Sequence, residues 1–417
     1  MGYQIQHAVV IGSGTMGGAI AAHLANIGVR VHLLDIVPGH LTPDEKKLGL
    51  TLADEAVRNR IASRGLQAAL NSKPASFYTE RAADLIRIGN LDDHFDVIQK
   101  ADWVIEVIIE NLEIKKNLME RVDQARRPDS IISTNTSGIP VGEIASGRSE
   151  SFKKHFLGTH FFNPPRYLKL LEIIPTEYTS SNVVEFMKHF GEYRLGKGVV
   201  ICKDTPNFIA NRLGFASGAF ALDRILEEGF TVKQIDDITG PLIGRPKTAT
   251  FRLLDLIGLD VWDHVGKNLL EMLPEDDPAY PYLQSSKVNQ LIEEMIDKGQ
   301  LGTKVGRGFY KQDKEEGKKV FYARNLTSGE YQPPEKISSQ AVKEAKGMEK
   351  LEERLGYLMT ADDPAANFIK SILLQGLAYA SQCIPEIADT PKPIDDAMRW
   401  GFGHQAGPFE IWDMLGL

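Results

Sequence analysis

Short apolar runs alternate with helix-length amphipathic stretches over the first 200 residues. Such runs are typical of strands buried on both faces, and the stretch at 16–27 places its apolar residues on one helical side. Strands are predicted at 7–12, 29–36, 101–108, 130–136, 156–163, 170–175 and 199–204, and a long polar stretch at about 43–97 is predicted to be helical. This alternation predicts an α/β domain whose parallel sheet is covered by helices on both faces.

Beyond Pro206 the apolar spacing becomes helical for most of the remaining chain. Residues 306–336 form an exception, because their composition predicts an exposed hairpin and a linker. The predicted domains are 1–197, a first helical domain at 198–310, a hairpin and linker at 311–345, and a second helical copy at 346–417.

The helical part contains an internal repeat. Ile235-Asp236-Asp237 recurs as Ile394-Asp395-Asp396, and the block 254–259 recurs as 412–417 at nearly the same offset. Two chance amphipathic helices could also look alike, but matching blocks at a constant offset favour a duplicated domain. The first copy continues past Leu259 where the second stops at Leu417, so we expect the second copy to be truncated and the chain to be a fragment of a longer polypeptide.

Charge and cysteine content narrow the function classes. The net charge of −8 argues against nucleic acid or an anionic membrane as the main partner. The two cysteines exclude a disulfide framework and a four-cysteine metal site, and no metal is expected. No apolar run is long enough to span a bilayer and no targeting segment is visible, so we predict no membrane insertion and a cytoplasmic location.

A dinucleotide-binding fingerprint follows the first predicted strand. The segment Gly12-Ser13-Gly14-Thr15-Met16-Gly17 opens the first helix, and Asp35 ends the next strand. Glycines permit the tight turn, the approach of the pyrophosphate and close helix packing, while the helix N-terminus attracts phosphate. Asp35 can accept hydrogen bonds from ribose hydroxyls, and no arginine follows it. The sequence therefore predicts a Rossmann-type domain that prefers NAD to NADP.

A histidine and a glutamate lie in successive strand candidates. His160 lies near the end of one, and Glu172 follows twelve residues later. If the two side chains are adjacent, the carboxylate can hold the imidazole in one tautomer and stabilise its protonated form. A lone strand histidine is more often structural, so this spacing alone leaves both interpretations open.

Several motifs together resemble a known family. GSGTMG (12–17), ENLEIKK (110–116), STNTS (133–137), HFFNP (160–164), KDTPNFIANRL (203–213) and GTKVGRGFY (302–310) look like the L-3-hydroxyacyl-CoA dehydrogenases of fatty acid β-oxidation. The resemblance covers about residues 5–310 and returns weakly in the second helical copy. It implies NAD as cofactor and an acyl-CoA as substrate.

The resemblance also implies roles for individual residues. His160 is expected to be the general base, oriented by Glu172. Ser137 is expected to hydrogen-bond the substrate oxygen at C3, and Asn211 to hold the substrate from the helical domain. The positions that match NAD contacts are Glu110, Lys115, Ser137, Asn163 and Lys304, in addition to the glycine-rich segment and Asp35.

One departure from the short family members concerns the helical domains. Where those members carry Gly-Pro-Phe-Glu, the first copy has Ala249-Thr250-Phe251-Arg252, and the motif appears instead at 407–410 in the second copy. Doubled helical domains resemble the larger bifunctional β-oxidation proteins, although no hydratase region is visible in this sequence. The second copy is expected to form an internal pseudo-dimer with the first, which places a conventional homodimer in doubt.

The predicted function is NAD-dependent oxidation of L-3-hydroxyacyl-CoA to 3-ketoacyl-CoA. Two alternatives remain open. One is an NAD-dependent dehydrogenase of a hydroxy acid without CoA, such as gulonate. The other is a catalytically silent NAD-binding structural protein, against which the presence of His160, Glu172, Ser137 and Asn211 together argues.

Overall fold

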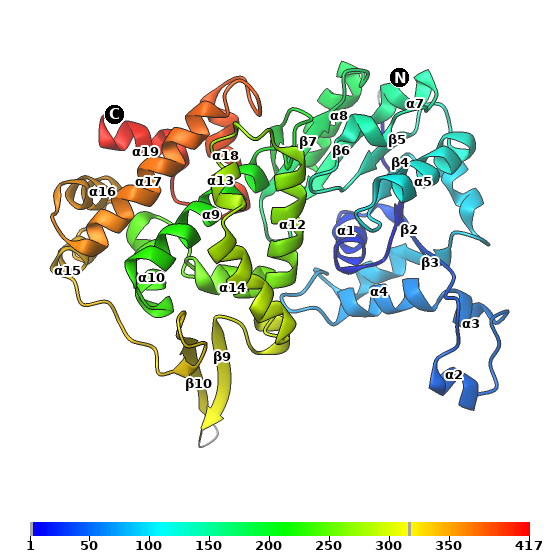
Figure 1. Cartoon of the computed structure of the whole chain (residues 1–417). Helices are drawn as coiled ribbons and strands as arrows, with labels where there is room; N and C mark the ends of the chain where they lie inside the picture. Colours follow the sequence, from blue (N-terminus) through cyan, green and yellow to red (C-terminus); the bar gives the residue numbers. More distant parts are fainter. Residues whose placement is uncertain (1–2, 316–317) are drawn as a thin grey trace. The chain divides into compact units, whose positions relative to one another are not determined.

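The computed structural model describes residues 3–315 and 318–417. It divides into a compact first unit that ends at Phe208 and a second that begins at Ile209 (Figure 1). Residues 1–2 of the predicted first domain and residues 316–317 of the predicted hairpin lie outside the described residues.

The first unit is built on an eight-stranded sheet in the order β3-β2-β1-β4-β5-β6-β7-β8. The strands are β1 (His7–Ile11), β2 (Arg30–Asp35), β3 (Ile86–Asn90), β4 (Trp103–Glu106), β5 (Ile131–Thr134), β6 (Phe156–Phe161), β7 (Leu170–Pro175) and β8 (Gly198–Ile201). All neighbouring pairs are parallel except β6 and β7, which are antiparallel.

Helices cover both faces of this sheet. Alternation along β1 places Ala8 and Val10 in one buried cluster with α1 (Thr15–Asn26) and α8 (Ser181–Tyr193), while Val9 is buried outside that cluster. The remaining helices are α2 (Pro43–Lys47), α3 (Glu55–Arg58), α4 (Arg60–Leu70), α5 (Leu112–Ala125), α6 (Val141–Ile144) and α7 (Glu150–His155), with 3-10 turns at Glu80–Leu85 and Phe95–Lys100. The near-continuous apolar strands predicted this two-sided burial.

Two predictions about this sheet were wrong. The stretch at 43–97 is not helical throughout, because it contains strand β3, which pairs only with β2 at the sheet edge. Arg87 of this strand is exposed, and the strand IRIGN is too short to show a clear alternation of apolar and polar residues. The sheet is also not wholly parallel. Only residues 162–169 separate β6 from β7, and a parallel crossover needs a longer connection.

The division between the units also lies later than the predicted boundary at 197/198. Strand β8 pairs in parallel with β7, so residues 198–201 belong to the sheet. The carboxylate of Asp204 accepts hydrogen bonds from the backbone N–H groups of Val141 (2.7 Å) and Gly142 (2.7 Å) at the start of α6. These contacts bind the connecting segment to the first unit as far as Phe208.

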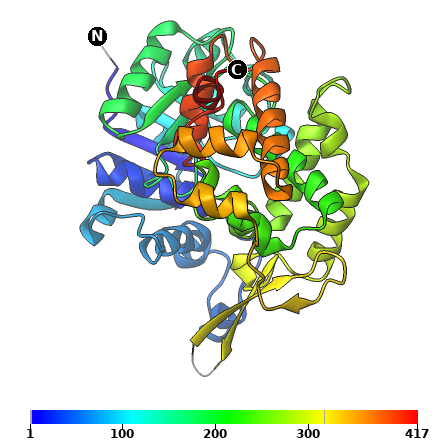
Figure 2. The same cartoon turned by 90° about the vertical axis from the view of Figure 1, so that its left-hand side faces the viewer.

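The second unit is helical apart from one small antiparallel sheet. Its helices are α9 (Ala210–Glu228), α10 (Val232–Thr239), α11 (Phe251–Ile257), α12 (Leu259–Met272), α13 (Tyr280–Leu283), α14 (Ser286–Asp297), α15 (Gln340–Lys346), α16 (Leu351–Thr360), α17 (Pro364–Gln382), α18 (Pro391–Gly401) and α19 (Pro408–Leu415). Strands β9 (Tyr310–Glu315), β10 (Lys318–Arg324) and β11 (Tyr331–Gln332) form the sheet. Figures 1 and 2 show β9 and β10 extending away from the helices, and an extended linker that leads on to α15.

The sequence repeat corresponds to a structural repeat. Helices α9, α10 and α11 of the first copy match α17, α18 and α19 of the second. Asp236 accepts a hydrogen bond from the backbone N–H of Phe251 (2.7 Å) at the start of α11, and Asp395 accepts one from Phe409 (2.8 Å) at the start of α19. The same carboxylate cap therefore recurs in both copies.

The two copies pack together through their first helices, α9 and α17, which run side by side. The buried Arg212 guanidinium of α9 donates hydrogen bonds to groups of both copies: Asp277 (2.5 Å), the Tyr379 hydroxyl (2.6 Å) and Glu386 (3.3 Å). These partners raise the pKa of Arg212 despite its burial. A buried charge must be paired in this way, because removing its partner lowers the stability of the protein by about 3–5 kcal/mol.

In the described part of the chain, no helix is both long enough and apolar enough to cross a membrane.

Candidate active site

The glycine-rich segment forms a tight turn between β1 and α1. Gly12 has φ +101°, and a Cβ there would overlap the backbone carbonyl of Val107. A Cβ on Gly17 would overlap the carbonyl of Gly12, whereas space is open beside Gly14. Gly12 and Gly17 thus lie where a side chain would not fit, and the approach of a pyrophosphate at Gly14 stays a prediction.

The N-terminus of α1 is suited to bind phosphate. Its N-cap is Gly14, which has no side chain, and no acidic residue lies in the first turn. The backbone N–H groups of Thr15, Met16 and Gly17 therefore lack an intrahelical acceptor and carry the positive end of the helix dipole. Such a terminus can hold the pyrophosphate of a dinucleotide.

Asp35 lies at the end of β2 and contacts the turn. Its carboxylate accepts hydrogen bonds from the Ser13 backbone N–H and hydroxyl (2.6 Å each) and from the Ile36 N–H (2.7 Å). Asp35 therefore fixes the glycine-rich turn as well as occupying the position expected for a ribose acceptor.

His160 and Glu172 lie directly opposite each other on the antiparallel strands β6 and β7. The Nδ1 atom of His160 lies 2.7 Å from a Glu172 carboxylate oxygen, and both side chains are buried. The proton therefore lies on Nδ1 in the neutral ring, which leaves the lone pair on Nε2. The structure thus brings together the pair that sequence spacing alone left open.

Two aromatic rings surround the imidazole. The Phe162 ring centroid is 4.4 Å from that of His160, and the Phe208 centroid is 5.7 Å away. His160 itself is only 5% exposed. Sequence reasoning missed both aromatic residues, although Phe162 lies within the HFFNP motif.

The remaining predicted residues of the first unit follow β4, β5 and β6 at the carboxyl edge of the sheet. Ser137 is partly exposed, and its backbone N–H donates to Glu110 (2.9 Å). Asn163 is exposed just beyond β6. The neighbouring Asn135, which was not predicted, accepts a hydrogen bond from the Phe161 N–H (2.9 Å) and so ties the loop after β5 to the strand of His160.

Lys115 is buried among carboxylates rather than presented at the surface. Its Nζ lies 2.7 Å from Glu106 and 3.2 Å from Glu110, and the side chain is 1% exposed. Burial alone would raise the pKa of Glu110, but Lys115 and the donors Thr136 and Ser137 lower it below the usual range. Glu110 and Lys115 therefore support the loops around the site, and their predicted contact with NAD stays a prediction.

Asn211 and Lys304 lie in the second unit. Asn211 is in the first turn of α9 and is partly exposed. The Lys304 ammonium forms an ion pair with Asp260 (2.5 Å). Their predicted roles toward substrate and cofactor stay predictions, whereas the residues of the first unit share one sheet edge, where ligands of open α/β sheets bind.

Comparisons with known proteins identify the family. The 3-hydroxyacyl-CoA dehydrogenase NAD binding domain matches residues 7–205, and the 3-hydroxyacyl-CoA dehydrogenase C-terminal domain matches residues 208–312. The chain belongs to the 3-hydroxyacyl-CoA dehydrogenase family. The predicted family, fold class and NAD-binding domain are thereby confirmed.

Relatives match over different parts of their lengths. A probable 3-hydroxyacyl-CoA dehydrogenase of Bacillus subtilis is 47% identical over 99% of this chain and 51% of its own length. One of Deinococcus radiodurans is 43% identical over 75% of this chain and 84% of its own. The chain thus spans about half the length of the first of these relatives.

A solved structure shares the fold over nearly the whole chain. It is 3-hydroxybutyryl-CoA dehydrogenase from Escherichia coli, which is 23% identical and has a TM-score of 0.64 over 99% of this chain and 93% of its own. The match shows that the fold extends through the second helical copy, beyond the two family domains.

Proposed function

We propose that this protein oxidises L-3-hydroxyacyl-CoA to 3-ketoacyl-CoA with NAD. The observation that carries the proposal is the buried His160–Glu172 pair at the carboxyl edge of the NAD-binding sheet. Membership of the 3-hydroxyacyl-CoA dehydrogenase family supports the choice of an acyl-CoA substrate over a hydroxy acid without CoA.

His160 acts as the general base. Because Glu172 holds the Nδ1 proton, Nε2 accepts the proton from the C3 hydroxyl, and the carboxylate stabilises the resulting imidazolium. The aromatic rings of Phe162 and Phe208 limit the access of water to this proton. A base positioned in this way accelerates the reaction by about 10²–10⁴-fold.

The chemistry that bound NAD would supply is acceptance of the hydride from C3. The residues that would hold it are the N–H groups at the start of α1 and the carboxylate of Asp35. We further assign to Ser137 a hydrogen bond to the C3 oxygen, since its hydroxyl is a neutral donor that does not compete for the proton. Asn211 is assigned a supporting contact with the substrate.

Two finer assignments belong to the same proposal. The packing of α9 against α17 around Arg212 supports an internal pseudo-dimer of the helical copies within one chain. A cytoplasmic location is the second assignment, which the low cysteine content supports.

His160→Gln tests the proposal. The amide keeps the size and polarity of the side chain but cannot accept a proton at neutral pH. We expect NADH binding, measured by fluorescence titration, to be retained, while acetoacetyl-CoA reduction falls by about 10²–10⁴. Turnover near that of the wild type would contradict the assignment of the base.

The same assay separates the alternatives. Free CoA should compete with acetoacetyl-CoA if the nucleotide part of the substrate is bound, and should have no effect on an enzyme of free hydroxy acids. A wild-type protein that binds NADH but turns over neither substrate class would support a silent NAD-binding protein.

A further inference from the structure

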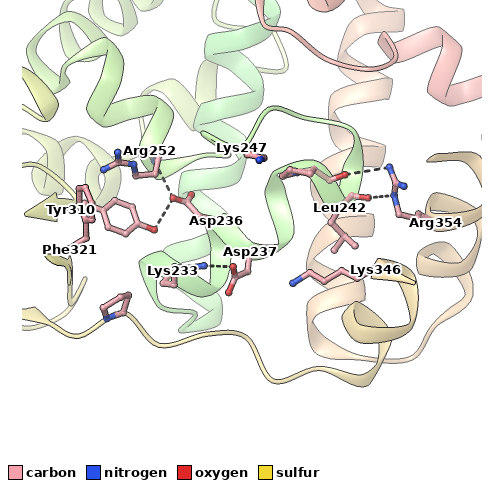
Figure 3. A pocket seen from close by; sticks show the side chains of 12 residues that line it. Lys233, Asp236, Asp237, Leu242, Lys247, Arg252, Tyr310, Phe321, Lys346 and Arg354 are labelled. Carbon is pink, nitrogen blue, oxygen red and sulfur yellow. Dashed lines mark hydrogen bonds and ion pairs between the residues drawn. The ribbon is translucent and has the colours of Figure 1, made fainter. Parts of the chain in front are cut away.

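The second unit contains a pocket of about 610 Å³. Figure 3 shows that side chains from α10, α11, β9, β10, α15 and α16 surround it, so segments that are far apart in the sequence meet there. We call it the cationic pocket because of the side chains that line it. Its volume lies within the range of about 300–1,000 Å³ in which proteins hold small organic ligands.

Cations outnumber carboxylates on the wall of the cationic pocket. The cations are Lys233, Lys247, Arg252, Lys346 and Arg354. Two carboxylates, Asp236 and Asp237, also line it. Charges of one sign around a hollow add their fields and attract a ligand of the opposite charge. The pocket therefore favours an anion, provided that the two carboxylates do not neutralise the cations.

Both carboxylates are already bound by the protein itself. Asp237 forms an ion pair with Lys233 on the same helix. Asp236 accepts hydrogen bonds from the Phe251 N–H (2.7 Å) and the Tyr310 hydroxyl (2.9 Å). Within the described ranges 3–315 and 318–417, the four other cations form no ion pair with a carboxylate. Most of the positive charge of the pocket is therefore uncompensated.

The Arg354 guanidinium is fixed in place but keeps its charge. It donates hydrogen bonds to the backbone carbonyl oxygens of Glu349 (2.8 Å), Leu242 (3.0 Å) and Met348 (3.2 Å), which are neutral acceptors. Its Nη2 atom reaches acceptors at 3.5 Å, beyond the range of a good hydrogen bond, so its donors remain available. The side chain is partly buried, and a guanidinium withdrawn from water is stabilised by an anion whose oxygens match its planar fork.

Arg252 is held by aromatic rings, which also leave its charge in place. Its guanidinium lies 5.3 Å from the ring centroid of Tyr310 and 5.1 Å from that of Phe321. A ring face attracts a cation without neutralising it. Lys247 and Lys346 are exposed, and Figure 3 shows Lys346 extending from α15 toward α10. The pocket thus combines two positioned arginines with two flexible lysines.

These features match phosphate in an organic compound. A phosphate group carries nearly two negative charges and three acceptor oxygens, so several cations can share it. The volume of the pocket is much larger than one phosphate requires, and the buried Leu242 adds an apolar side chain to its wall.

We propose that the cationic pocket binds a small organic compound that carries two or more phosphate groups. The two arginines and the two exposed lysines bind the phosphate oxygens through charge-assisted hydrogen bonds, and the apolar wall beside Leu242 contacts the organic part. The site is formed by residues of the second unit alone, and it is independent of the proposed enzymatic activity.

Calorimetric titration of the full chain with ADP tests the proposal. Saturating NADH is present throughout, so that ADP does not occupy the glycine-rich turn of the first unit. We expect saturable binding of ADP. Its affinity should fall at least about tenfold in the double variant Lys247→Gln/Lys346→Gln, because two charge-assisted hydrogen bonds are lost. Lys343→Gln/Lys350→Gln removes the same charge from exposed positions that do not line the pocket, and should leave the affinity unchanged.

Two further ligands separate the parts of the proposal. Inorganic pyrophosphate should bind more weakly than ADP because it has no organic part, and adenosine should not bind because it has no phosphate. Absence of saturable ADP binding, or equal affinities of the wild type and Lys247→Gln/Lys346→Gln, would overturn the proposal. An equal loss in both double variants would reduce the effect to the general field of the protein and would also overturn it. Displacement of ADP by hexaglutamate at lower concentrations than by pyrophosphate would overturn it by assigning the pocket to an acidic polypeptide.

Discussion

Glu110 in the first unit and Asp236 and Asp255 in the second unit have different kinds of partner. In the first unit, Glu110 meets the Lys115 ammonium, and its pKa is lowered although burial opposes this. In the second unit, Asp236 and Asp255 meet backbone N–H groups and a phenol, and burial raises the pKa of each to about 6. Glu110 thus pairs with a cation beside the candidate site, whereas Asp236 and Asp255 hold helix and strand ends.

The difference shows that burial alone does not mark a functional carboxylate. Glu172 is fully buried, and it borders an imidazole whose second nitrogen is available for chemistry. Asp255 is nearly as buried, but both of its oxygens are used by the backbone. The group that each carboxylate contacts therefore decides whether it has a functional or a structural role.

Replacing Lys115 by Met should have the largest effect. Glu106 would stay buried, and Glu110 partly buried, without their cation, so we expect the free energy of unfolding to fall by about 3–5 kcal/mol, measured by urea denaturation. Lys116→Met, which removes only longer contacts to Glu113 (3.9 Å) and Glu143 (3.8 Å), is the matched control. A stable Lys115→Met protein that no longer binds NADH would instead favour the predicted cofactor contact.

Glu172→Gln should have the next largest effect, on activity. The amide oxygen can still accept the Nδ1 hydrogen bond but does not stabilise the imidazolium, so we expect kcat to fall about 10²-fold with NADH binding unchanged. Glu185→Gln, at an exposed position on α8, should behave as the wild type. An unchanged kcat in Glu172→Gln would remove the carboxylate from the mechanism.

The smallest predicted effect is on the pH dependence of stability, through Asp255 of the second unit. Because the folded pKa of Asp255, about 6, lies above the ordinary value of 3.8, the folded state binds the extra proton. Binding of this proton by Asp255 therefore raises the free energy of unfolding by about 1 kcal/mol as the pH falls from about 7 to 5. The same stabilisation is lost as the pH rises through 6. In Asp255→Asn the change in unfolding free energy between these pH values should shrink by that amount. A variant with the wild-type pH dependence would contradict the assignment.

Much of the fold and site followed from local patterns. Seven strands and the glycine-rich turn were predicted because apolar runs bounded by glycine are strong signals. The repeat predicted the duplicated helices in the same way. Strand β3 was missed because a short edge strand with one exposed arginine has little periodicity.

The site was only partly predictable. The GxGxxG spacing and Asp35 are contiguous signals with a steric reason, so they could be found directly. Phe208 could not, because its contact with His160 depends on the path of the segment after β8. The burial of Lys115 between Glu106 and Glu110 was likewise invisible, since a helix-surface lysine and a buried one have the same local sequence.

The sequence by itself determined the nucleotide-binding turn, seven of the eight strands of the first unit's sheet and the duplicated helical blocks, because short-range spacing and residue size control these features. Only the tertiary structure decided that His160 faces Glu172 across an antiparallel pair, and that Lys115 is buried beside Glu106 and Glu110. Register and burial arise from contacts between segments that are distant in the sequence, so local spacing does not reveal them.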